Sequence, residues 1–431
     1  MPAQSYKRRV VITGYGMITP SGKNTDETFE NCARGVSGVD YINSFDTSGF
    51  PCRIGGEVDN EWLEDFEGRN DRKLKKFLSR GARLMRIAVS EAAERAGLDE
   101  IEDRHSIGLA LGSHGDNPSV DEMLFLHRFY DGAGHWDMEG LVQAGGYPYL
   151  LFFRRKPDAA TSVLSTLFNC KGPNISIVSA CAAGSQSIGE AVRIIQDGKS
   201  NIMIAGGCEA TLDFTGMLGF ILLKALAEKY TTPQTASRPF DRKRNGFVMS
   251  EGAAAVILEE LEHARSRGAR IYGEIKGYGS SADAYRITDT HPKGLGAILA
   301  IKGALDDASV SPEDVDYINA HGTSTVQNDL TETRAIKEVF GERAKAIPIS
   351  SNKSMLGHTI AAAGAIECIL TMIGINRSII LPTINHEFRD PKCDLDYVPN
   401  EARTKEHRTA ISNSFGFGGQ NACLCLGAFE E

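Results

Sequence analysis

The chain has 431 residues, of which 42% are hydrophobic and 24% are charged, a composition that excludes an intrinsically disordered protein. Because this length exceeds the usual size of a single hydrophobic core, we expect two domains or two fused halves. The formal net charge of −9 gives no overall attraction to nucleic acid or to an anionic membrane. We therefore expect neither as a partner.

Three features of the sequence predict a cytoplasmic protein. The apolar run within residues 1–22, MPAQSYKRRVVITGYGMITPSG, is broken by glycine and proline, unlike the core of a secretory signal. No stretch approaches the roughly 18 uninterrupted apolar residues of a transmembrane helix. The nine cysteines are scattered and include no C-x-x-C pair, which argues against both a disulfide framework and a zinc site.

Short runs rich in β-branched residues alternate with longer helical patterns along the chain. Strands that interleave with helices predict an α/β fold with parallel or mixed sheets. In chain order, the predicted strands are RRVVITGYG (8–16), SIGLALGS (106–113), NISIVSA (174–180), NIMIAGG (201–207), AAAVILEEL (253–261), IYGEIKGYG (271–279), VDYINAHG (315–322), IPISSNK (347–353) and ACLCLGA (422–428).

Two stretches share one pattern of strand, serine-containing turn and apolar helix. They are ISIVSACAAGSQSIGEAVRII (175–195) and IPISSNKSMLGHTIAAAGAIECIL (347–370). This similarity predicts an internal duplication with one cleft between the halves. A charged helix near residue 260 is the expected joint, so we divide the chain into residues 1–260 and 261–431. Residues 113–160, rich in aromatics and glycine without a clean period, are expected to form an insertion that acts as a lid, an interface arm or a pocket wall.

Cys181 lies between a predicted strand and a predicted helix. The apolar residues after it, from Ile188 to Ile195, recur at helical spacings. Unpaired amides at a helix start favour a thiolate and can lower the pKa of the thiol, and they can also bind an oxyanion. A lone cysteine in a tight turn is more often a buried core residue. Its assignment as a nucleophile therefore depends on partners elsewhere in the chain.

Two histidines and a lysine are the candidate partners of Cys181. His321 ends a predicted strand, and strand ends of α/β proteins face the crevice in which ligands bind. His358 opens a helix whose amides disfavour its protonation, so we expect a neutral ring that donates from Nε2. Lys353, in the turn before it, supplies a positive charge that Glu367 can hold. Structural roles, as cap histidines or a surface lysine, are the alternative.

Residues 413–426, NSFGFGGQNACLCL, combine two aromatic residues with three glycines. Phe415 and Phe417 alternate with small residues in a way that no ordinary helix allows, and glycine adopts backbone conformations closed to other residues. We expect a hinged loop in which an aromatic side chain gates the cleft and a backbone amide faces it. A tight turn before the strand ACLCL is the structural alternative.

The densest positive stretch lies within residues 73–86, where six basic side chains follow the pattern of an amphipathic helix. Such a helix face is usually only solvated. On an acidic chain it is nevertheless the strongest candidate surface for an acidic partner.

Four of these segments, in this order and at these spacings, resemble the signature motifs of the β-ketoacyl-acyl carrier protein synthases, specifically the elongating type II condensing enzymes. They are VSACAAGSQSIG, NAHGTSTVQND, NKSMLGH with AAAGAIE, and NSFGFGG. The similarity extends over nearly the whole chain and includes RPFDRKRNGFVMSEGAAAVILEE. Asn352, where the family usually has threonine, and the long segment 113–160 depart from the family pattern.

The resemblance implies a thiolase fold, in which two related α/β halves form a five-layered α-β-α-β-α core, usually within a homodimer. It implies Cys181 as the acyl-carrying nucleophile, His321 and His358 as the decarboxylation pair, and Lys353 as the supporting cation. It also implies supporting, gating and docking residues. These are the oxyanion-hole amides of Cys181 and Phe417, the gate residues Phe415, Phe417 and Gly418, the supporting acids Asp329, Glu332 and Glu367, and Arg72, Lys73 and Lys76 for docking an acyl carrier protein.

The implied reaction is a decarboxylative Claisen condensation, in which malonyl-acyl carrier protein extends the acyl group on Cys181 by two carbons. It needs no metal and no cofactor beyond the phosphopantetheine that carries the substrates. Fatty-acid elongation and a specialised polyketide or polyene pathway both fit, and in the latter the chain would form a heterodimer with a chain-length-factor-like partner. A non-catalytic chain-length factor and a degradative thiolase fit less well, because the former lacks the nucleophile and the latter uses two catalytic cysteines.

Overall fold

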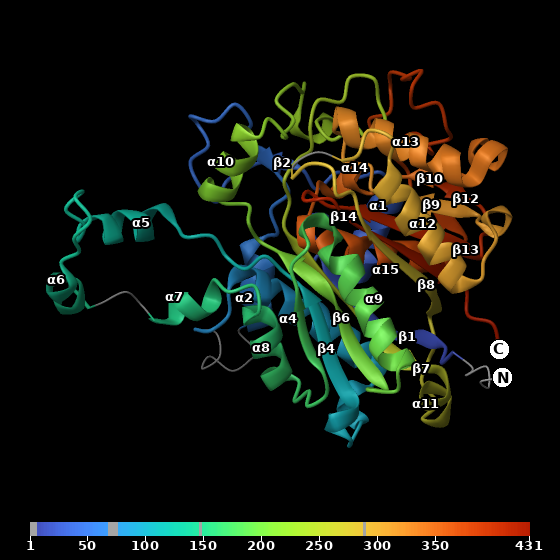
Figure 1. The fold of residues 1–431 in the computed structure, drawn as a ribbon, viewed down its shortest axis with the longest axis horizontal. Coiled ribbons are helices and arrows are strands. Elements are labelled where there is room, and N and C mark those ends of the chain that lie inside the picture. Colours follow the sequence, from blue (N-terminus) through green and yellow to red (C-terminus); the bar gives the residue numbers. More distant parts are fainter. Residues whose placement is uncertain (1–6, 68–75, 146–148, 288–289) are drawn as a thin grey trace.

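A ten-stranded mixed sheet forms the centre of the protein (Figure 1). The computed structural model describes residues 7–67, 76–145, 149–287 and 290–431. Along the sheet, the strand order is β10-β9-β13-β14-β8-β1-β7-β6-β4-β5. The strands are β1 (Val10–Ile18), β4 (Ile107–Gly112), β5 (Asn174–Ile177), β6 (Ile202–Glu209), β7 (Gly252–Glu260), β8 (Gly273–Ala282), β9 (Tyr317–Asn319), β10 (Ile349–Ser350), β13 (Thr409–Phe415) and β14 (Gln420–Gly427).

The sheet consists of two five-stranded halves with the same topology. Numbered from its own first strand, each half has the order 1-5-4-2-3, with antiparallel pairing on both sides of strand 5 and parallel pairing among the other three. The halves join where β1 pairs with β8 at Val11 and Ile12. The predicted pair of related α/β halves is thereby confirmed.

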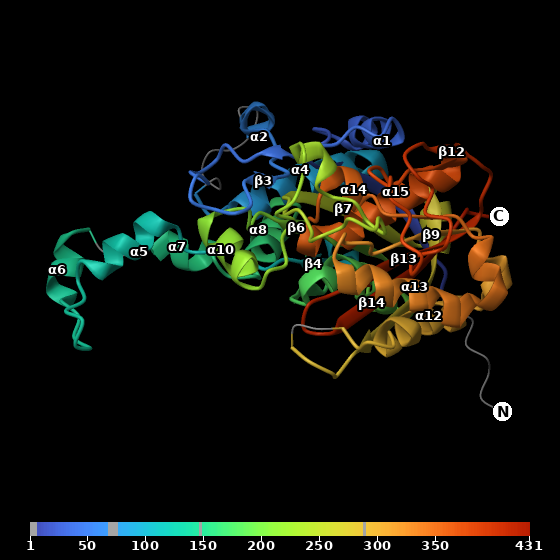
Figure 2. The same cartoon turned by 90° about the horizontal axis from the view of Figure 1, so that it is seen from above.

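Helices form three layers around the two halves of the sheet, so the molecule has the expected five layers. Helices α4 and α8 cover the outer face of the first half, α9 and α15 lie between the halves, and α12 and α13 cover the outer face of the second half (Figures 1 and 2). Their bounds are α4 (Arg80–Ala96), α8 (Ala159–Leu167), α9 (Ala183–Gln196), α12 (Leu295–Ala308), α13 (Val326–Phe340) and α15 (Ala363–Arg377).

Glycines set the distance between each outer helix and its sheet. In β1, a Cβ at Gly16 would lie 2.2 Å from the carbonyl oxygen of Ala88 in α4. In β8, a Cβ at Gly279 would lie 2.0 Å from the carbonyl oxygen of Ala300 in α12. The same glycine-to-alanine contact thus recurs in both halves, as an internal duplication predicts.

Helix α15 and the turn before it form an apolar segment, Ile360–Arg377, with a mean hydropathy of 1.4. By length and composition alone it could cross a membrane, but 89% of it is buried inside the protein. It lies between the two halves of the sheet, where a core helix has to be apolar on all sides.

The predicted insertion forms an arm that stands away from the body of the protein (Figures 1 and 2). It leaves the sheet after β4 and returns through α8 to β5. The arm exposes Trp136, Val142, Phe152 and Phe153 to an extent of 49 to 70%. Its three helices are α5 (Val120–His127), α6 (Met138–Gln143) and α7 (Tyr149–Arg154).

Shorter elements complete the fold. The strands are β2 (Asp40–Tyr41), β3 (Ile54–Gly55), β11 (Ile379–Ile380) and β12 (Arg403–Thr404), and the helices are α1 (Thr25–Ala33), α2 (Asn60–Glu67), α10 (Phe214–Leu222), α11 (Leu261–Ser266) and α14 (Lys353–Leu356). The 3-10 turns are Leu98–Glu100, Arg104–Ser106, Ala180–Ala182, Pro233–Thr235, Pro312–Asp314, Gly341–Lys345 and Ile360–Ala362.

All nine predicted strands are present, and the charged helix at the joint is α11. Strand β13 was not predicted from the sequence. The basic helix expected over residues 73–86 is present from Arg80 onward, as the start of α4, whereas residues 76–79, which end at the N-cap Ser79, are not helical. Arg80 and Arg83 also form ion pairs with Glu251 and Glu67, so their charges are not available as a free basic face.

Candidate active site

Cys181 lies in the 3-10 turn between β5 and α9 and is 2% exposed. Its neighbour Ala180 has a φ of +46°, in the left-handed region, and the chain turns sharply there. The residues that follow Cys181 are small, so the second half of the protein can pack closely against them. A Cβ at Gly184 would lie 2.8 Å from the carbonyl oxygen of Ala361, so glycine lets the starts of α9 and α15 approach each other.

Burial and hydrogen bonding act in opposite directions on the thiol of Cys181. Burial is the stronger effect and raises the pKa of Cys181 to about 11, against the backbone amides of Phe417 and Cys181 and the charge of Lys353, which lower it. The lowered pKa expected from the helix start is therefore wrong for the free protein. The amides do face the sulfur, but removing a thiolate from water outweighs them.

His358 donates toward this sulfur. Its Nε2 lies 3.1 Å from the Sγ of Cys181, and its Nδ1 accepts a hydrogen bond of 3.2 Å from the backbone amide of Ile360. Because Nδ1 is an acceptor, the ring proton of neutral His358 resides on Nε2. Burial, and after it the charge of Lys353, lowers the pKa of His358 well below its ordinary value. The ring is thus a neutral Nε2 donor.

His321 approaches the same point from the end of β9. It is 2% exposed, and its ring packs edge-on against that of His358 with centroids 5.3 Å apart. Burial, followed by the charges of Lys353 and His358, lowers the pKa of His321 well below its ordinary value. Both rings are therefore neutral at physiological pH.

The ligand atoms of Cys181, His321 and His358 lie within 4.8 Å of one another, a grouping that could suit a metal ion. The tautomer of His358 argues against this use. A metal-bound histidine coordinates through a nitrogen lone pair and usually donates from its other ring nitrogen. Here the amide of Ile360 occupies the Nδ1 lone pair and the proton is on Nε2. The donor set suits hydrogen bonding better than coordination.

Lys353 and Glu367 form a buried ion pair beside the two histidines. Each side chain is 3% exposed, and the Lys353 Nζ contacts the Oε1 of Glu367. Burial raises the pKa of Glu367 to about 7, and Lys353 acts against this rise. The pair brings a fixed positive charge close to the site, where it disfavours protonation of both imidazoles.

Glu332 and Asp329, both on α13, hold the loop that carries His321. The two oxygens of Glu332 accept the backbone amides of His321 and Gly322, each at 2.8 Å. Asp329 accepts the amide of Phe240 at 2.7 Å and lies 3.5 Å from the guanidinium of Arg244. Both carboxylates are fully buried, and neither lines the site directly.

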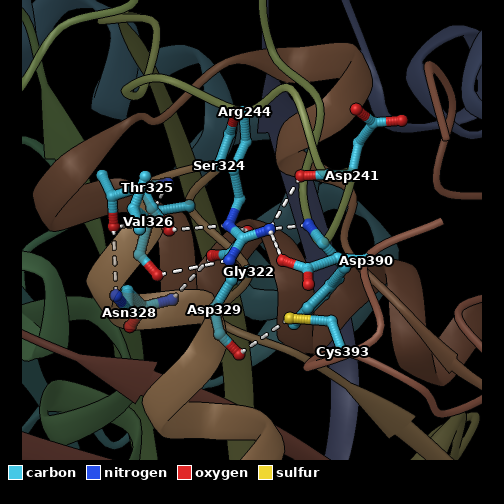
Figure 3. A network of polar contacts seen from close by, with 12 residues as sticks. Asp241, Arg244, Gly322, Ser324, Thr325, Val326, Asn328, Asp329, Asp390 and Cys393 are labelled. Atoms are coloured by element: carbon cyan, nitrogen blue, oxygen red, sulfur yellow. Dashed lines mark hydrogen bonds and ion pairs between the residues drawn. The ribbon is translucent and has the colours of Figure 1, made fainter. Parts of the chain in front are cut away.

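Arg244 was missed by the sequence reasoning, although RPFDRKRNGF contains it. Its guanidinium donates to the carbonyl oxygens of Thr325 and Val326 and to Asp390, at 3.3, 3.4 and 2.7 Å. Figure 3 shows it between the loop after His321, the carboxylate of Asp329 and Asp390. It therefore braces the end of this loop, whereas Glu332 holds its start.

The glycine-rich segment begins as a strand and continues as a turn. Phe415 is the last residue of β13 and is buried, whereas Phe417 lies in the turn and packs against Phe220 and Phe247 with centroids 6.2 and 6.3 Å apart. Gly418 follows it with a φ of +92°, a conformation that favours glycine.

These elements enclose one cavity of about 320 Å³. Its lining includes Cys181, His321, His358, Phe415, Phe417 and Gly418. Residues from both halves of the chain therefore meet at one cleft. Of the predicted docking residues, Lys76 is exposed, and Arg72 and Lys73 lie outside the described residues.

Comparisons with known proteins agree over most of the chain. The models of the N-terminal and C-terminal domains of β-ketoacyl synthases match residues 7–264 and 272–387. The 3-oxoacyl-[acyl-carrier-protein] synthase 2 of Staphylococcus aureus (strain COL) is 42% identical over 427 residues, covering 99% of this chain and 100% of the relative.

Two solved structures resemble the fold closely. One is the complex AntDE:AntF (apo), a type II polyketide synthase acyl-carrier protein in complex with its ketosynthase bound to the hexaketide. It has 34% identity and a TM-score of 0.83, over 98% of this chain and 100% of that one. The other is the ishigamide ketosynthase/chain length factor, with 32% identity, a TM-score of 0.84 and the same coverage.

Proposed function

The chain belongs to the β-ketoacyl synthase family, and we propose that Cys181 carries the acyl group in its reaction. That reaction is the condensation that a β-ketoacyl-acyl carrier protein synthase catalyses. One observation supports the assignment most strongly. A buried thiol, a neutral histidine donor at 3.1 Å and two backbone amides converge on a single sulfur at the base of a cavity. A packing cysteine has no need of such partners.

In the first step, the sulfur of Cys181 attacks an acyl thioester on the carrier protein. The thiol proton leaves with the carrier thiol, so the half-reaction exchanges no proton with solvent. The Nε2–H of His358 and the nearby amides stabilise the thiolate as it forms. Burial keeps the free thiol protonated at rest, which protects it from solvent-borne electrophiles.

In the second step, a malonyl thioester loses carbon dioxide. His321 and His358 donate hydrogen bonds to the enolate oxygen, and they can do so because both rings are neutral and carry a proton. The resulting carbanion attacks the acyl carbon on Cys181. The amides of Cys181 and Phe417 hold the oxyanion of the tetrahedral intermediate, an effect worth roughly 3 kcal/mol per donor.

The ion pair of Lys353 with Glu367 supports both steps by placing a fixed positive charge beside the two histidines. The charge of Lys353 next to the imidazoles helps to keep them neutral, and Glu367 holds that cation in the core. Glu332 positions the His321 loop by accepting two of its backbone amides. Asp329 acts through Arg244, whose guanidinium braces the same loop.

We propose that the turn after β13 is the gate of the cleft. Phe417 lines the cavity and packs against the aromatic rings of Phe220 and Phe247, and Gly418 after it has a positive φ that favours glycine. Phe415, buried at the strand end, anchors the turn.

The proposed partner is an acyl carrier protein, whose phosphopantetheine brings the substrates, so that no further cofactor is required. The solved complex AntDE:AntF supports this partner. Lys76, with Arg72 and Lys73, remains the proposed docking site. Eight of the nine cysteines are buried and all are free, which suits the reducing cytoplasm that we propose as the location.

We propose a dimer in which the arm and β5 meet a second subunit. Strand β5 is the outermost strand of the sheet, and beside it Val178 is 55% exposed. The arm is inserted between β4 and β5 and carries exposed aromatic residues, so edge and arm together offer surface for a second subunit. A homodimer is the first proposal. The ishigamide ketosynthase/chain length factor supports the alternative, a heterodimer within a specialised polyketide or polyene system.

The two halves, residues 1–260 and 261–431, are proposed as the functional units. The first supplies the nucleophile, and the second supplies both histidines, the lysine and the gate. The division is supported by β7, which ends at Glu260, and by the repeated topology on either side of it.

A reconstituted turnover assay tests the function. Purified protein, an acyl-carrier thioester and malonyl-carrier protein should yield a β-ketoacyl-carrier product that is two carbons longer, with release of carbon dioxide. Failure with a panel of straight, branched and unsaturated acyl groups, while the protein remains folded, would contradict independent catalysis.

A further inference from the structure

A row of polar side chains runs through the core behind the catalytic groups, between β9 and α15. Tyr317 packs in the inner hydrophobic cluster with α15 and Ile318 in the outer one, so Asn319 faces inward again. On α15, Glu367 and Thr371 lie four residues apart and share one face. Along the extended chain, the stretch from Tyr317 to the catalytic His321 spans about 13 Å, which gives the length of the row.

One end of the row reaches the active site and the other lies just below the surface. At the inner end, Glu367 pairs with Lys353. In the middle, the hydroxyl of Tyr317 lies 2.7 Å from the Oγ of Ser350. At the outer end, the ring of His407 packs edge-on against Tyr317, with centroids 5.6 Å apart.

His407 is oriented to exchange a proton inward. Its Nδ1 donates to the carbonyl oxygen of Lys405 at 2.8 Å, so its Nε2 presents a lone pair. Gly374 of α15 lies beside that nitrogen, since a Cβ there would be 3.7 Å from it. Although His407 is 2% exposed, the adjacent Lys405 and Glu406 are exposed, which places His407 directly below the surface.

Six side-chain atoms along the row have no hydrogen-bond partner among the described residues, and none of their residues is more than 2% exposed. Buried polar atoms are normally satisfied, often by internal water. Several in one row indicate a polar seam that holds water between its side chains. We define the seam as Tyr317, Asn319, Ser350, Glu367, Thr371, Ser412 and His407. The six atoms without a partner are Asn319 Oδ1 and Nδ2, Glu367 Oε2, Thr371 Oγ1, Ser412 Oγ and His407 Nε2.

The condensation step creates a demand for a proton. The electron pair of the bond to the malonyl carboxylate forms the new carbon–carbon bond, and carbon dioxide leaves without a proton. The acyl carbon–sulfur bond breaks and its electrons remain on Cys181. One proton per round must therefore reach a buried sulfur to restore the thiol.

We propose that the polar seam delivers this proton from solvent at His407 to the Lys353–Glu367 pair beside Cys181. The inference rests on the proposed function in that Cys181 is taken as the acyl carrier. Lys353 passes a proton toward the thiolate across the active site, and Glu367 returns one to Lys353. Glu367 is then refilled through the hydroxyls and waters of the seam. The high thiol pKa, about 11, makes the thiolate a strong acceptor at the end of this path.

The two half-reactions separate this role from a structural one. Acylation needs no solvent proton, because the thiol proton leaves with the carrier thiol, whereas condensation takes one up. Tyr317→Phe and His407→Phe interrupt the seam. Tyr397→Phe is the matched control, since Tyr397 also loses a buried hydroxyl contact, 2.7 Å from the Oγ1 of Thr333, but lies in the outer cluster of the second half.

Pre-acylated protein is mixed rapidly with malonyl-carrier protein in weakly buffered solution containing a pH indicator, and product is quantified by quenching. In the wild type and in Tyr397→Phe, uptake of one proton should keep pace with product formation. In both seam variants, the rate of proton uptake should fall at least about tenfold below the rate of product formation, while the rate of Cys181 acylation stays unchanged. Uptake that keeps pace in the seam variants, or acylation that slows equally, would overturn the proposal. Absence of any acyl adduct on the wild type would instead refute the proposed function.

Discussion

The Nε2 of His358 lies 3.1 Å from the Sγ of Cys181, although the two residues are 177 positions apart in the chain. The backbone of His358 is tied to the first half, because its amide donates to the carbonyl of Val248 at 2.7 Å and its carbonyl accepts from Ser250 at 3.1 Å. The nucleophile and its donor are thus assembled only when both halves have folded together.

His321→Ala should separate the two half-reactions. The imidazole of His321 is assigned to the enolate of malonyl decarboxylation and not to acyl transfer, so condensation should fall by roughly 10² to 10³-fold. Acylation of Cys181 should stay within a fewfold of the wild type. Rapid-quench assays of each half-reaction measure this. Equal losses in both would contradict the assignment of His321.

Removing one member of the Lys353–Glu367 pair should destabilise the fold more than removing both. Glu367→Gln leaves a buried ammonium uncompensated, which costs about 3 to 5 kcal/mol. In Lys353→Met, the charge that lowers the pKa of Glu367 is gone, so this pKa rises above the value of about 7 that it has beside Lys353, and Glu367 takes up a proton. The loss of stability should therefore shrink as the pH falls.

Urea unfolding of both single variants and of Lys353→Met/Glu367→Gln forms a double-mutant cycle. We expect a coupling free energy of at least about 2 kcal/mol. Additive losses would show that the two charges are solvated independently of each other.

Alkylation of Cys181 should keep accelerating with pH beyond the range of an ordinary thiol. Burial raises the pKa of Cys181 to about 11, and only the thiolate reacts with iodoacetamide. An ordinary cysteine reaches its plateau above a pKa of about 8.5. Peptide mass mapping of the alkylated protein over a pH series follows Cys181 separately from the other thiols. A plateau near neutral pH would show that the amides and Lys353 outweigh burial.

Val178→Asp should dissociate the proposed dimer. The substitution puts a charge at the edge strand β5, where each copy would be buried against the other subunit, so the dimer dissociation constant should rise by at least about 100-fold. Light scattering after size exclusion measures the mass. Val36→Asp is the matched control, because Val36 is also exposed, at 46%, and lies away from the arm and from β5. A dimer that survives Val178→Asp, or dissociates equally with Val36→Asp, would exclude this interface.

The sequence predicts the positions of the strands because these follow from local patterns, whereas the five layers are implied by the family resemblance. Buried apolar runs such as IGLALG indicate strands without knowledge of their neighbours, and the paired motifs around Cys181 and His358 indicate the duplication. Strand β13 was missed because the glycines that follow it, Gly416, Gly418 and Gly419, made the segment look like loop throughout. Its regularity comes from pairing with β9 and β14.

Electrostatic properties were harder to predict than positions. The helix start at Cys181 is visible in the sequence, but the complete burial that raises the pKa of its thiol depends on Phe417 and His358 from the other half. The basic stretch failed for a similar reason. Arg80 and Arg83 look solvated in isolation, yet their partners Glu251 and Glu67 are supplied by tertiary structure. Arg244 acts only through contacts that the fold creates.

The role of Cys181 is tested most directly by the intact mass of the protein after incubation with acyl-carrier thioesters, with Cys181→Ala in parallel and malonyl-carrier protein added afterwards. We expect an acyl adduct on the wild type alone, which disappears on malonyl addition as a product two carbons longer forms. An adduct that persists in Cys181→Ala, or a folded wild type that takes up no acyl group from any carrier thioester, would contradict Cys181 as the acyl-carrying nucleophile.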